Sequence, residues 1–263
     1  MIAATAITIG CMGLTCGAAL ALAARFLGVN EDPRIEQVND ALPGANCGGC
    51  GYAGCADYAK AIVVDGAKIN LCAPGGAQTV AAIAALMGVE AEAAEKKVAI
   101  VLCGGDSTKA PRRFSYNGVA DCRAAHSVGG GEKACPYGCL GYGSCARVCP
   151  VGAIEITEAN LAVVHPALCI GCGACVKACP RNLIKMVPAS RQIHVLCSSK
   201  DKGPLVKKAC QVGCIGCTVC TKLCDEGAIK MDGFLAVVDY ARDLTNEAVI
   251  EKCPGKCIVK VES

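Results

Sequence analysis

A run without any charge lies at the N-terminus. Residues 2–24 contain no Asp, Glu, Lys, Arg or His, and Arg25 is the first charged side chain. A helix needs about 20 mostly apolar residues to span the hydrocarbon core of a bilayer, so this run is long enough. A secretory signal would instead carry positive charge before a shorter apolar core. We predict a transmembrane helix in residues 1–28, in which Cys11 and Cys16 are small apolar side chains rather than ligands.

Positive charge follows this run instead of preceding it. Arg25 and Arg34 lie on its C-terminal side, and positive residues favour the cytoplasmic side of a membrane. We therefore expect a single pass through the inner (cytoplasmic) membrane, with the rest of the chain in the cytoplasm. The alternative is that residues 2–24 form a buried helix of a soluble domain.

Beyond the apolar run, the pattern changes to short mixed stretches separated by cysteine-rich turns. Residues 29–46 are polar and mixed, as in a connector. Residues 47–97 contain a first cysteine group, followed by an Ala- and Glu-rich stretch from Ala77 that we expect to be a helical spacer. Within this part, residues 56–71 favour a helix and a turn that would carry Cys72 back toward the earlier cysteines.

From residue 98 onward the pattern repeats itself. Residues 135–149 align without gaps with residues 210–224, and Gly-Ala-Ile and Leu-Ala-Val-Val follow both copies. Val-Leu-Cys also precedes both copies, ending at Cys103 in the first and at Cys197 in the second. This pattern indicates an internal duplication.

The duplicated unit resembles a ferredoxin. We predict a two-cluster ferredoxin-like module in residues 98–190 and a degenerate second module in residues 191–263. Each module should contain two short β-hairpins and two short helices wrapped around clusters. The predicted fold class is therefore α+β, with small metal-built modules: an N-terminal transmembrane helix, a 4Fe-4S domain and tandem ferredoxin-like domains.

Composition separates two interpretations of the cysteines. The chain has 263 residues and 24 cysteines, a density typical of either a disulfide scaffold or a metal protein. The cysteines recur in C-x2-C-x2-C-x3-C runs, which is the spacing of iron–sulfur ligands and not of a disulfide framework. The chain has no Trp and only 3 Phe, so metal–thiolate bonds would replace part of the missing core. The net charge of +3 gives no argument for nucleic acid.

The spacing predicts four [4Fe–4S] sites. In two-cluster ferredoxins the last cysteine of each run, before a proline, binds the cluster of the other run. Cys135 enters one set as a stand-in, because Tyr142 occupies the usual ligand position. The four predicted sets are Cys47, Cys50, Cys55 and Cys72; Cys149, Cys169, Cys172 and Cys175; Cys135, Cys139, Cys145 and Cys179; and Cys214, Cys217, Cys220 and Cys253.

The second copy leaves the number of clusters open. Asp243, Asn246 and Val249 occupy positions that hold ligands in the first copy, so one cluster has been lost or rebuilt. The sequence therefore indicates at least three clusters and supplies ligands for four. A fifth cluster would use the remaining cysteines of this copy, which are Cys197, Cys210, Cys224 and Cys257.

Two cysteines and the choice of metal also stay open. Cys103 and Cys122 are either buried free thiols or members of an unrecognised site with Cys135. Zinc is the alternative metal, chiefly for the Cys47 group, because zinc sites prefer C-x2-C pairs separated by a longer loop.

No other catalytic machinery stands out. The three histidines, His126, His165 and His194, are scattered along the chain. Residues 129–134 fit a G-x-G-x-x-A pattern but lead into Cys135-Pro136 rather than a long helix, which argues against dinucleotide binding.

The order of these parts resembles the B subunit of the Rnf complex, the membrane-bound, ion-translocating ferredoxin:NAD⁺ oxidoreductase of bacteria. The most diagnostic piece is Cys-Gly-Gly-Cys-Gly-Tyr-Ala-Gly-Cys at residues 47–55 with a distant Cys72, and the resemblance covers essentially the whole chain. The extra module is similar to longer forms of this protein in anaerobes.

The resemblance implies an electron-transfer subunit without a catalytic site of its own. It would accept electrons from soluble reduced ferredoxin and relay them to membrane subunits of the complex, where NAD⁺ is reduced and Na⁺ or H⁺ is pumped. One alternative is a membrane-attached polyferredoxin that reduces a redox sensor. A second is a corrinoid iron–sulfur partner, but such a protein would need a large cobalamin-binding barrel, for which this chain has no room.

Overall fold

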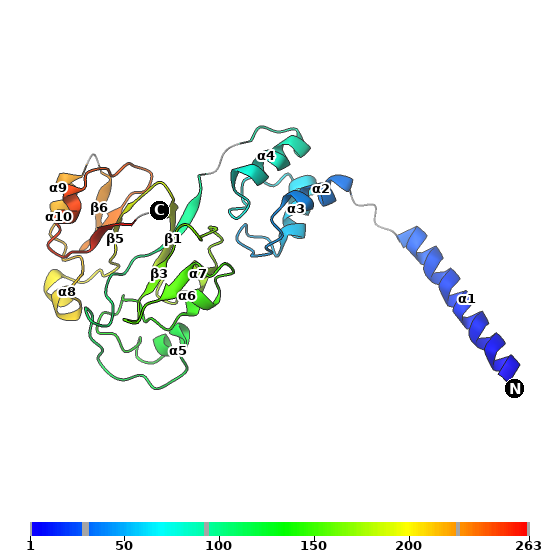
Figure 1. Cartoon of the computed structure of the whole chain (residues 1–263), viewed down its shortest axis with the longest axis horizontal. Coiled ribbons are helices and arrows are strands. Elements are labelled where there is room, and N and C mark those ends of the chain that lie inside the picture. The colour runs from blue at the N-terminus through cyan, green and yellow to red at the C-terminus, as the bar shows by residue number, and fades with distance from the viewer. Residues whose placement is uncertain (1, 28–31, 92–94, 225–226, 262–263) are drawn as a thin grey trace.

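The computed structural model describes residues 2–27, 32–91, 95–224 and 227–261. Its first element, α1 (Ile2–Leu27), stands apart from the other elements (Figure 1). The side chains described in α1 are almost all exposed, and Leu14 is 76% exposed. A helix is thus present where the sequence predicts one. Within the described residues, however, no helix is long and apolar enough to span a bilayer, so the predicted transmembrane helix is not confirmed.

Three helices form the domain that follows. They are α2 (Pro33–Ala41), α3 (Cys55–Asp65) and α4 (Gly76–Met87). Their apolar faces meet around Val38, Tyr58, Ile62 and Ile83, all almost fully buried. The spacer helix ends at Met87, earlier than predicted, because Gly88 adopts a left-handed conformation and its N–H caps the last turn.

The first ferredoxin-like module follows α4. Its strands β1 and β4 pair antiparallel, from Lys97 opposite Pro188 to Val101 opposite Ile184, and β2 and β3 form a hairpin. The prediction of two hairpins per module is therefore wrong, because the second strand pair joins the two ends of the module. The elements are β1 (Lys97–Val101), α5 (Cys122–Ser127), α6 (Ser144–Arg147), β2 (Ile154–Ile156), β3 (Ala162–Val164), α7 (Ala174–Ala178) and β4 (Ile184–Pro188).

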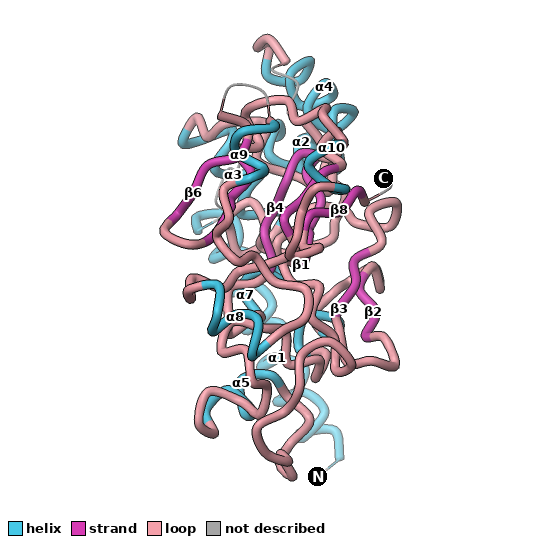
Figure 2. Tube along the Cα trace, turned by 90° about the vertical axis from the view of Figure 1, so that its left-hand side faces the viewer, coloured by secondary structure: helices cyan, strands magenta, loops and turns pink. Residues whose placement is uncertain are grey.

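The second module has the same plan. Strands β5 and β8 from its two ends pair antiparallel, and β6 and β7 form a hairpin. Across both modules the described strands form two-stranded sheets, of which Figure 2 shows the β2–β3 hairpin most clearly. The elements are β5 (Ile193–Val195), α8 (Gly203–Ala209), α9 (Val219–Leu223), β6 (Ile229–Asp232), β7 (Leu235–Val238), α10 (Ala248–Glu251) and β8 (Ile258–Lys260).

Cysteines make up a large part of both module cores. Cys139, Cys145, Cys169 and Cys175 are buried among the aliphatic side chains of the first core, and the second core has the same composition. Tyr240 packs against both cores, so the two modules are in contact. A core of this kind is expected where metal–thiolate bonds replace part of the hydrophobic burial.

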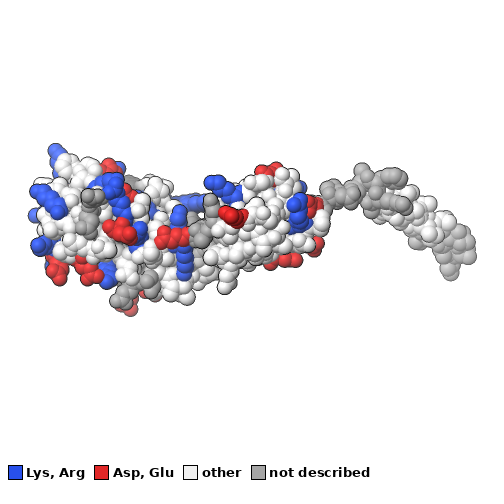
Figure 3. Space-filling model, turned by 90° about the horizontal axis from the view of Figure 1, so that it is seen from above, with Lys and Arg blue, Asp and Glu red and all other residues white. Residues whose placement is uncertain are grey.

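Charges of both signs are mixed on the surface. In the face shown in Figure 3, Lys and Arg side chains are interspersed with Asp and Glu. The described ion pairs each have at least one exposed partner, such as Lys200 with Asp232 and Lys230 with Asp239. Pairs of this kind contribute little to stability, typically about 0 to 1 kcal/mol.

Candidate metal centres

Three loops of the two modules share one backbone shape. In each, a glycine with positive φ follows the first cysteine by two residues, and a second left-handed residue precedes a short helix. Successive N–H groups of such a turn point into one concavity, which suits an anionic iron–sulfur cluster. The left-handed residues are Gly141 and Gly143, Gly171 and Gly173, and Gly216 and Thr218.

The structure brings the four cysteines of the first predicted set together. Cys72 is buried, and burial raises the pKa of its thiol, with the nearby thiols of Cys55, Cys50 and Cys47 adding to the rise. Tyr58 fixes the returning chain: its hydroxyl donates to the carbonyl of residue 68 at 2.7 Å and accepts the N–H of residue 71 at 3.1 Å. The predicted helix and turn therefore carry Cys72 back as expected.

Asn46 supports this site from outside the ligand set. Its side-chain oxygen accepts the N–H of Cys55 at 2.8 Å, and its backbone has a φ of 45°. Replacement by alanine leaves the N–H without this partner, which costs about 1 kcal/mol. We expect the Asn46→Ala variant to lose iron from the Cys47 site to a chelator roughly fivefold faster than the wild type, since about 1 kcal/mol corresponds to a factor of about five. The measurement is the decay of visible absorbance.

Asn46→Asp is the matched control for this prediction. It keeps the acceptor oxygen and also tolerates a left-handed backbone, so we expect decay at the wild-type rate. Equal decay of Asn46→Ala and the wild type would show that the hydrogen bond does not support the site.

The second predicted set also converges. Burial raises the pKa of Cys175 to about 11, and the thiols of Cys169, Cys172 and Cys149 reinforce the rise. Backbone N–H groups point at two of these sulfurs. The Ala99 N–H donates to Cys169 Sγ at 3.4 Å, and residue 153 donates to Cys149 Sγ at 3.3 Å. Such hydrogen bonds are among the factors that set cluster potentials.

The third set differs from the prediction in one residue. Cys139, Cys145 and Cys179 lie together, but their fourth neighbour is Cys122 and not Cys135. Burial raises the pKa of Cys145 to about 12, with nearby Cys139, Cys122 and Cys179 contributing. Tyr142, in the usual ligand position, instead donates its hydroxyl hydrogen to Glu132 at 3.0 Å.

A small polar network holds Cys122 in this place. Asp121 caps α5, accepts the Ser144 hydroxyl at 2.7 Å and pairs with Arg147 at 2.6 Å. The Ser144 hydroxyl oxygen in turn accepts the Cys122 N–H at 2.8 Å. One signal in the sequence could have revealed this: the segment from Cys103 to Cys135 is much longer than its counterpart in the second copy. The extra length carries Cys122.

The fourth set converges with one additional thiol. Cys214, Cys217, Cys220 and Cys253 line a pocket of the second module. Cys257 joins them, with its sulfur 3.8 Å from that of Cys253. Hydrogen bonding by Cys257 lowers the pKa of Cys253 to about 5 and that of Cys214 to about 6, which favours their thiolates.

In the degenerate half of the second module, the residues at the former ligand positions have structural roles. Val249, which replaces a ligand, is almost fully buried in the core, and Asn246 donates to the carbonyl of Leu223 at 2.7 Å. Asp243 forms an ion pair with Arg191. Cys224 points its thiol at the carbonyl groups of Thr221 and residue 229. No ligands for a cluster remain at these described positions.

The predicted fifth set is not assembled. The sulfur of Cys257 lies beside Cys253 and the thiol of Cys224 points at two carbonyl groups, and neither residue lines the pocket that contains Cys197 and Cys210. The last two instead meet Cys103 and Cys135 in a separate pocket. The alternative interpretation of Cys103, a site shared with Cys135, therefore agrees with the structure, whereas Cys122 belongs elsewhere.

The first two sites are in direct backbone contact. A Cβ atom at Gly49, between Cys47 and Cys50, would lie 2.6 Å from the Cys172 carbonyl oxygen. A Cβ atom at Gly171 would lie 3.4 Å from that of Ala73, the neighbour of Cys72. Electrons therefore have a short path from one site to the other.

The donor sets consist of thiols, which are the ligands that iron–sulfur clusters use. All 24 cysteines are free thiols, and the N–H groups directed at sulfurs agree with cluster binding.

Comparison with known proteins supports the assignment of iron–sulfur clusters to these sites. Residues 42–74 match the family model described as "Putative Fe-S cluster", and residues 162–185 match the 4Fe-4S binding domain. These segments contain the Cys47 group and the Cys169–Cys179 run. Fold and sites together thus define an iron–sulfur protein with ferredoxin-type domains.

Full-length relatives narrow the assignment. The chain is 46% identical over 95% of its length to the B subunit of the Na⁺-translocating ferredoxin:NAD⁺ oxidoreductase complex of Acetobacterium woodii, covering 75% of that protein. It is 45% identical to the proton-translocating counterpart of Clostridium ljungdahlii, covering 96% of this chain and 90% of the relative. Identity to the B subunit of the ion-translocating oxidoreductase complex of Methanosarcina acetivorans is 41%, over 94% of both chains. The chain belongs to this family of B subunits.

Proposed function

We propose that this chain relays electrons from reduced ferredoxin, through [4Fe–4S] clusters, to the membrane subunits of an ion-translocating ferredoxin:NAD⁺ oxidoreductase. The observation that carries the proposal is the contact between consecutive cysteine sites, at Gly49 and Cys172. The printed names of the relatives supply the donor and the complex. NAD⁺ reduction and ion translocation belong to other subunits.

The cluster ligands follow from the convergence described above. Each cluster supplies one-electron transfer, and the chain binds it, orients it and keeps water away from it. The proposed sets are Cys47, Cys50, Cys55 and Cys72; Cys149, Cys169, Cys172 and Cys175; Cys122, Cys139, Cys145 and Cys179; and Cys214, Cys217, Cys220 and Cys253.

The output end is the Cys47 site. The domain that holds this site is the next one after α1 in the chain (Figure 1). If α1 anchors the chain in the membrane, the Cys47 site is therefore the cysteine site nearest to the membrane. We propose that α1 attaches the chain to the cytoplasmic membrane, with the cluster domains in the cytoplasm. Support comes from the uncharged sequence of residues 2–24 and from the exposed apolar side chains of Met12, Leu14 and Leu20.

The input end is the Cys214 site. Cys217 is exposed, so a cluster bound there has an edge near the solvent, where a soluble donor can approach. Phe234 is 41% exposed beside it, since a Cβ atom on neighbouring Gly216 would touch the backbone of Phe234. The ammonium group of Lys202 lies 5.9 Å from the centre of the Phe234 ring. This apolar and positive patch suits an acidic face of ferredoxin.

Reversing one charge tests this docking patch. We expect Lys202→Glu to raise the KM for ferredoxin roughly fivefold while kcat stays unchanged, and the effect should shrink as salt is added. The measurement is ferredoxin-dependent NADH formation by the intact complex. Lys60→Glu makes the same charge change on the exposed face of α3 and serves as the control. Equal effects of the two variants would place docking elsewhere.

The function itself is tested with the assembled complex in membrane vesicles. Reduced ferredoxin and NAD⁺ should yield NADH, and Cys169→Ala in this chain should abolish the reaction. An intact complex that reduces no NAD⁺ from ferredoxin would contradict the proposal. Reduction of a redox sensor by such a complex would favour the alternative of a membrane-attached polyferredoxin.

A further inference from the structure

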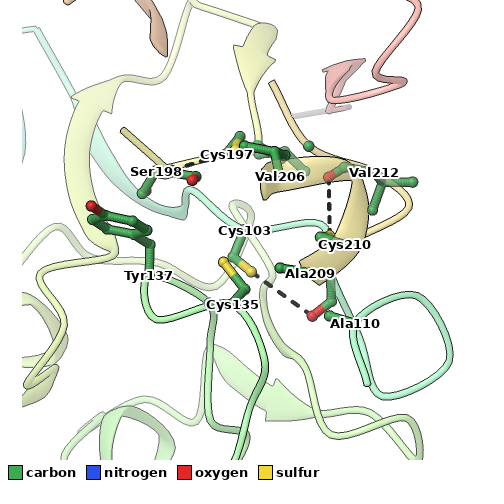
Figure 4. A pocket seen from close by; sticks show the side chains of 15 residues that line it. Cys103, Ala110, Cys135, Tyr137, Cys197, Ser198, Val206, Ala209, Cys210 and Val212 are labelled. Atoms are coloured by element: carbon green, nitrogen blue, oxygen red, sulfur yellow. Dashed lines mark hydrogen bonds between the residues drawn. The ribbon is translucent and has the colours of Figure 1, made fainter. Parts of the chain in front are cut away.

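Four cysteines that the proposed relay does not use line one pocket. They are Cys103, Cys135, Cys197 and Cys210 (Figure 4). In the alignment of the two copies, Cys103 corresponds to Cys197, and Cys135 corresponds to Cys210. Each module therefore contributes the same two positions to the pocket, which lies where the modules meet.

Hydrogen bonds between the modules hold these positions together. The N–H of Gly104 donates to the carbonyl of Leu196 at 3.0 Å, and the Ser198 hydroxyl donates to the carbonyl of Leu102 at 2.9 Å. The two segments that carry Cys103 and Cys197 thus run side by side. The packing is close, since a Cβ atom at Gly105 would lie 2.9 Å from Cys210 Sγ.

The sulfurs of this pocket accept N–H groups from neighbouring sites. Cys139, in the third site, donates its backbone N–H to Cys103 Sγ at 3.3 Å. Cys214, at the equivalent position of the second copy, directs its backbone N–H at the sulfur of Cys197. The pocket is thus connected through one hydrogen bond to a cysteine on each side.

Two cations beside the pocket form no ion pair within the described part of the chain. Lys133 is only 5% exposed, and its ammonium group donates to the carbonyl oxygens of residue 105 and Cys139. Arg181 is half-buried and donates to the carbonyls of residues 130, 135 and 138. A buried charge is costly unless an opposite charge compensates for it. Lys133 therefore indicates an anionic group at the four cysteines, whereas Arg181 also lines the pocket of the third site and has the buried carboxylate of Glu132 nearby.

We propose that Cys103, Cys135, Cys197 and Cys210 hold a fifth [4Fe–4S] cluster that bridges the two modules. Each thiol releases its proton as it binds iron, and the resulting negative charge of the cluster compensates for Lys133. The cluster lies between the Cys139 and Cys214 sites and links them. This inference rests on the proposed relay and completes it, because it supplies the centre between its two modules.

Iron and acid-labile sulfide content of the full-length chain, purified anaerobically, tests the bridging cluster. Five cubanes correspond to about 20 iron atoms per chain, and we expect the double variant Cys103→Ala/Cys197→Ala to hold about 16. Loss of two ligands, one from each module, prevents assembly at this pocket. Cys224→Ala removes a cysteine outside every proposed set and should retain the wild-type iron and sulfide content.

Equal iron content in the wild type and the double variant would overturn the inference, as would one zinc per chain that the variant loses. If the alanine double variant cannot be purified, the double variant Cys135→Ser/Cys210→Ser replaces it. The iron content of the wild type is then also decisive, because about 20 iron atoms per chain support the fifth cluster and about 16 contradict it. The relay proposal fails separately, in the NADH assay. A chain with five clusters that takes no electrons from ferredoxin would contradict the function and leave the bridging cluster standing.

Discussion

Replacing Cys122 with alanine should cost the chain one cluster. The third site then lacks its fourth thiolate, and Tyr142 cannot substitute because its hydroxyl is bound to Glu132. We expect the loss of about four iron atoms, or a three-iron cluster with an EPR signal in the oxidised state. Electron flow through the complex should fall to the background rate, because the site lies in the middle of the relay. Iron analysis, EPR spectroscopy and ferredoxin-dependent NADH formation measure these effects.

The two repeats suggest a rescue of this variant. Position 142 corresponds to Cys172 in the second run and to Cys217 in the second copy, and all three loops have left-handed residues at the same two positions. Tyr142→Cys in the Cys122→Ala background should therefore restore the cluster. If Cys122→Ala keeps its full iron content and ferredoxin-dependent activity, Cys122 is not a ligand and the assignment to Cys135 regains support.

Enlarging Gly49 should separate the first two sites without emptying them. A Cβ atom there would lie 2.6 Å from the Cys172 carbonyl oxygen, which is backbone and cannot swing away. Gly49→Val must therefore move the Cys47 loop away from the first module. We expect ferredoxin-dependent NADH formation to fall severalfold, because the electron must then tunnel over a longer distance between the two sites. Iron content should stay at the wild-type value.

Ala45→Val is the matched control for Gly49→Val. Ala45 precedes the same loop and is exposed, so the added methyl groups should leave activity unchanged. Full activity of Gly49→Val with all its iron would mean that the contact between the two sites does not limit electron transfer.

Regular spacing made much of this site predictable. Cys169, Cys172 and Cys175 follow one another at intervals that a single tight loop can aim at one centre, and the loop has the expected left-handed glycines. The return of Cys72 also followed from the sequence, because a helix and a turn between Cys55 and Cys72 leave few other routes. In both cases local geometry decides which thiols meet.

Long-range pairing explains what the sequence did not reveal. Cys122 reaches its site through the Asp121–Ser144–Arg147 network, which no spacing rule contains. The pocket of Cys103 and Cys197 depends on how two modules pack against each other, and a motif within one module carries no information about that. The strand pair β1–β4 was missed for the same reason, because its partners come from opposite ends of the module.

A cluster bound by both modules would also act as a cross-link. Ties between positions far apart in the chain restrict the unfolded ensemble more than local ones do, and Cys103 and Cys197 lie in different modules. Oxidative destruction of this one cofactor would release the C-terminal module from the rest of the chain. Amide hydrogen exchange around Leu102 and Leu196 would then accelerate together. Damage by oxygen would therefore loosen the contact between the two modules as well as interrupt electron transfer.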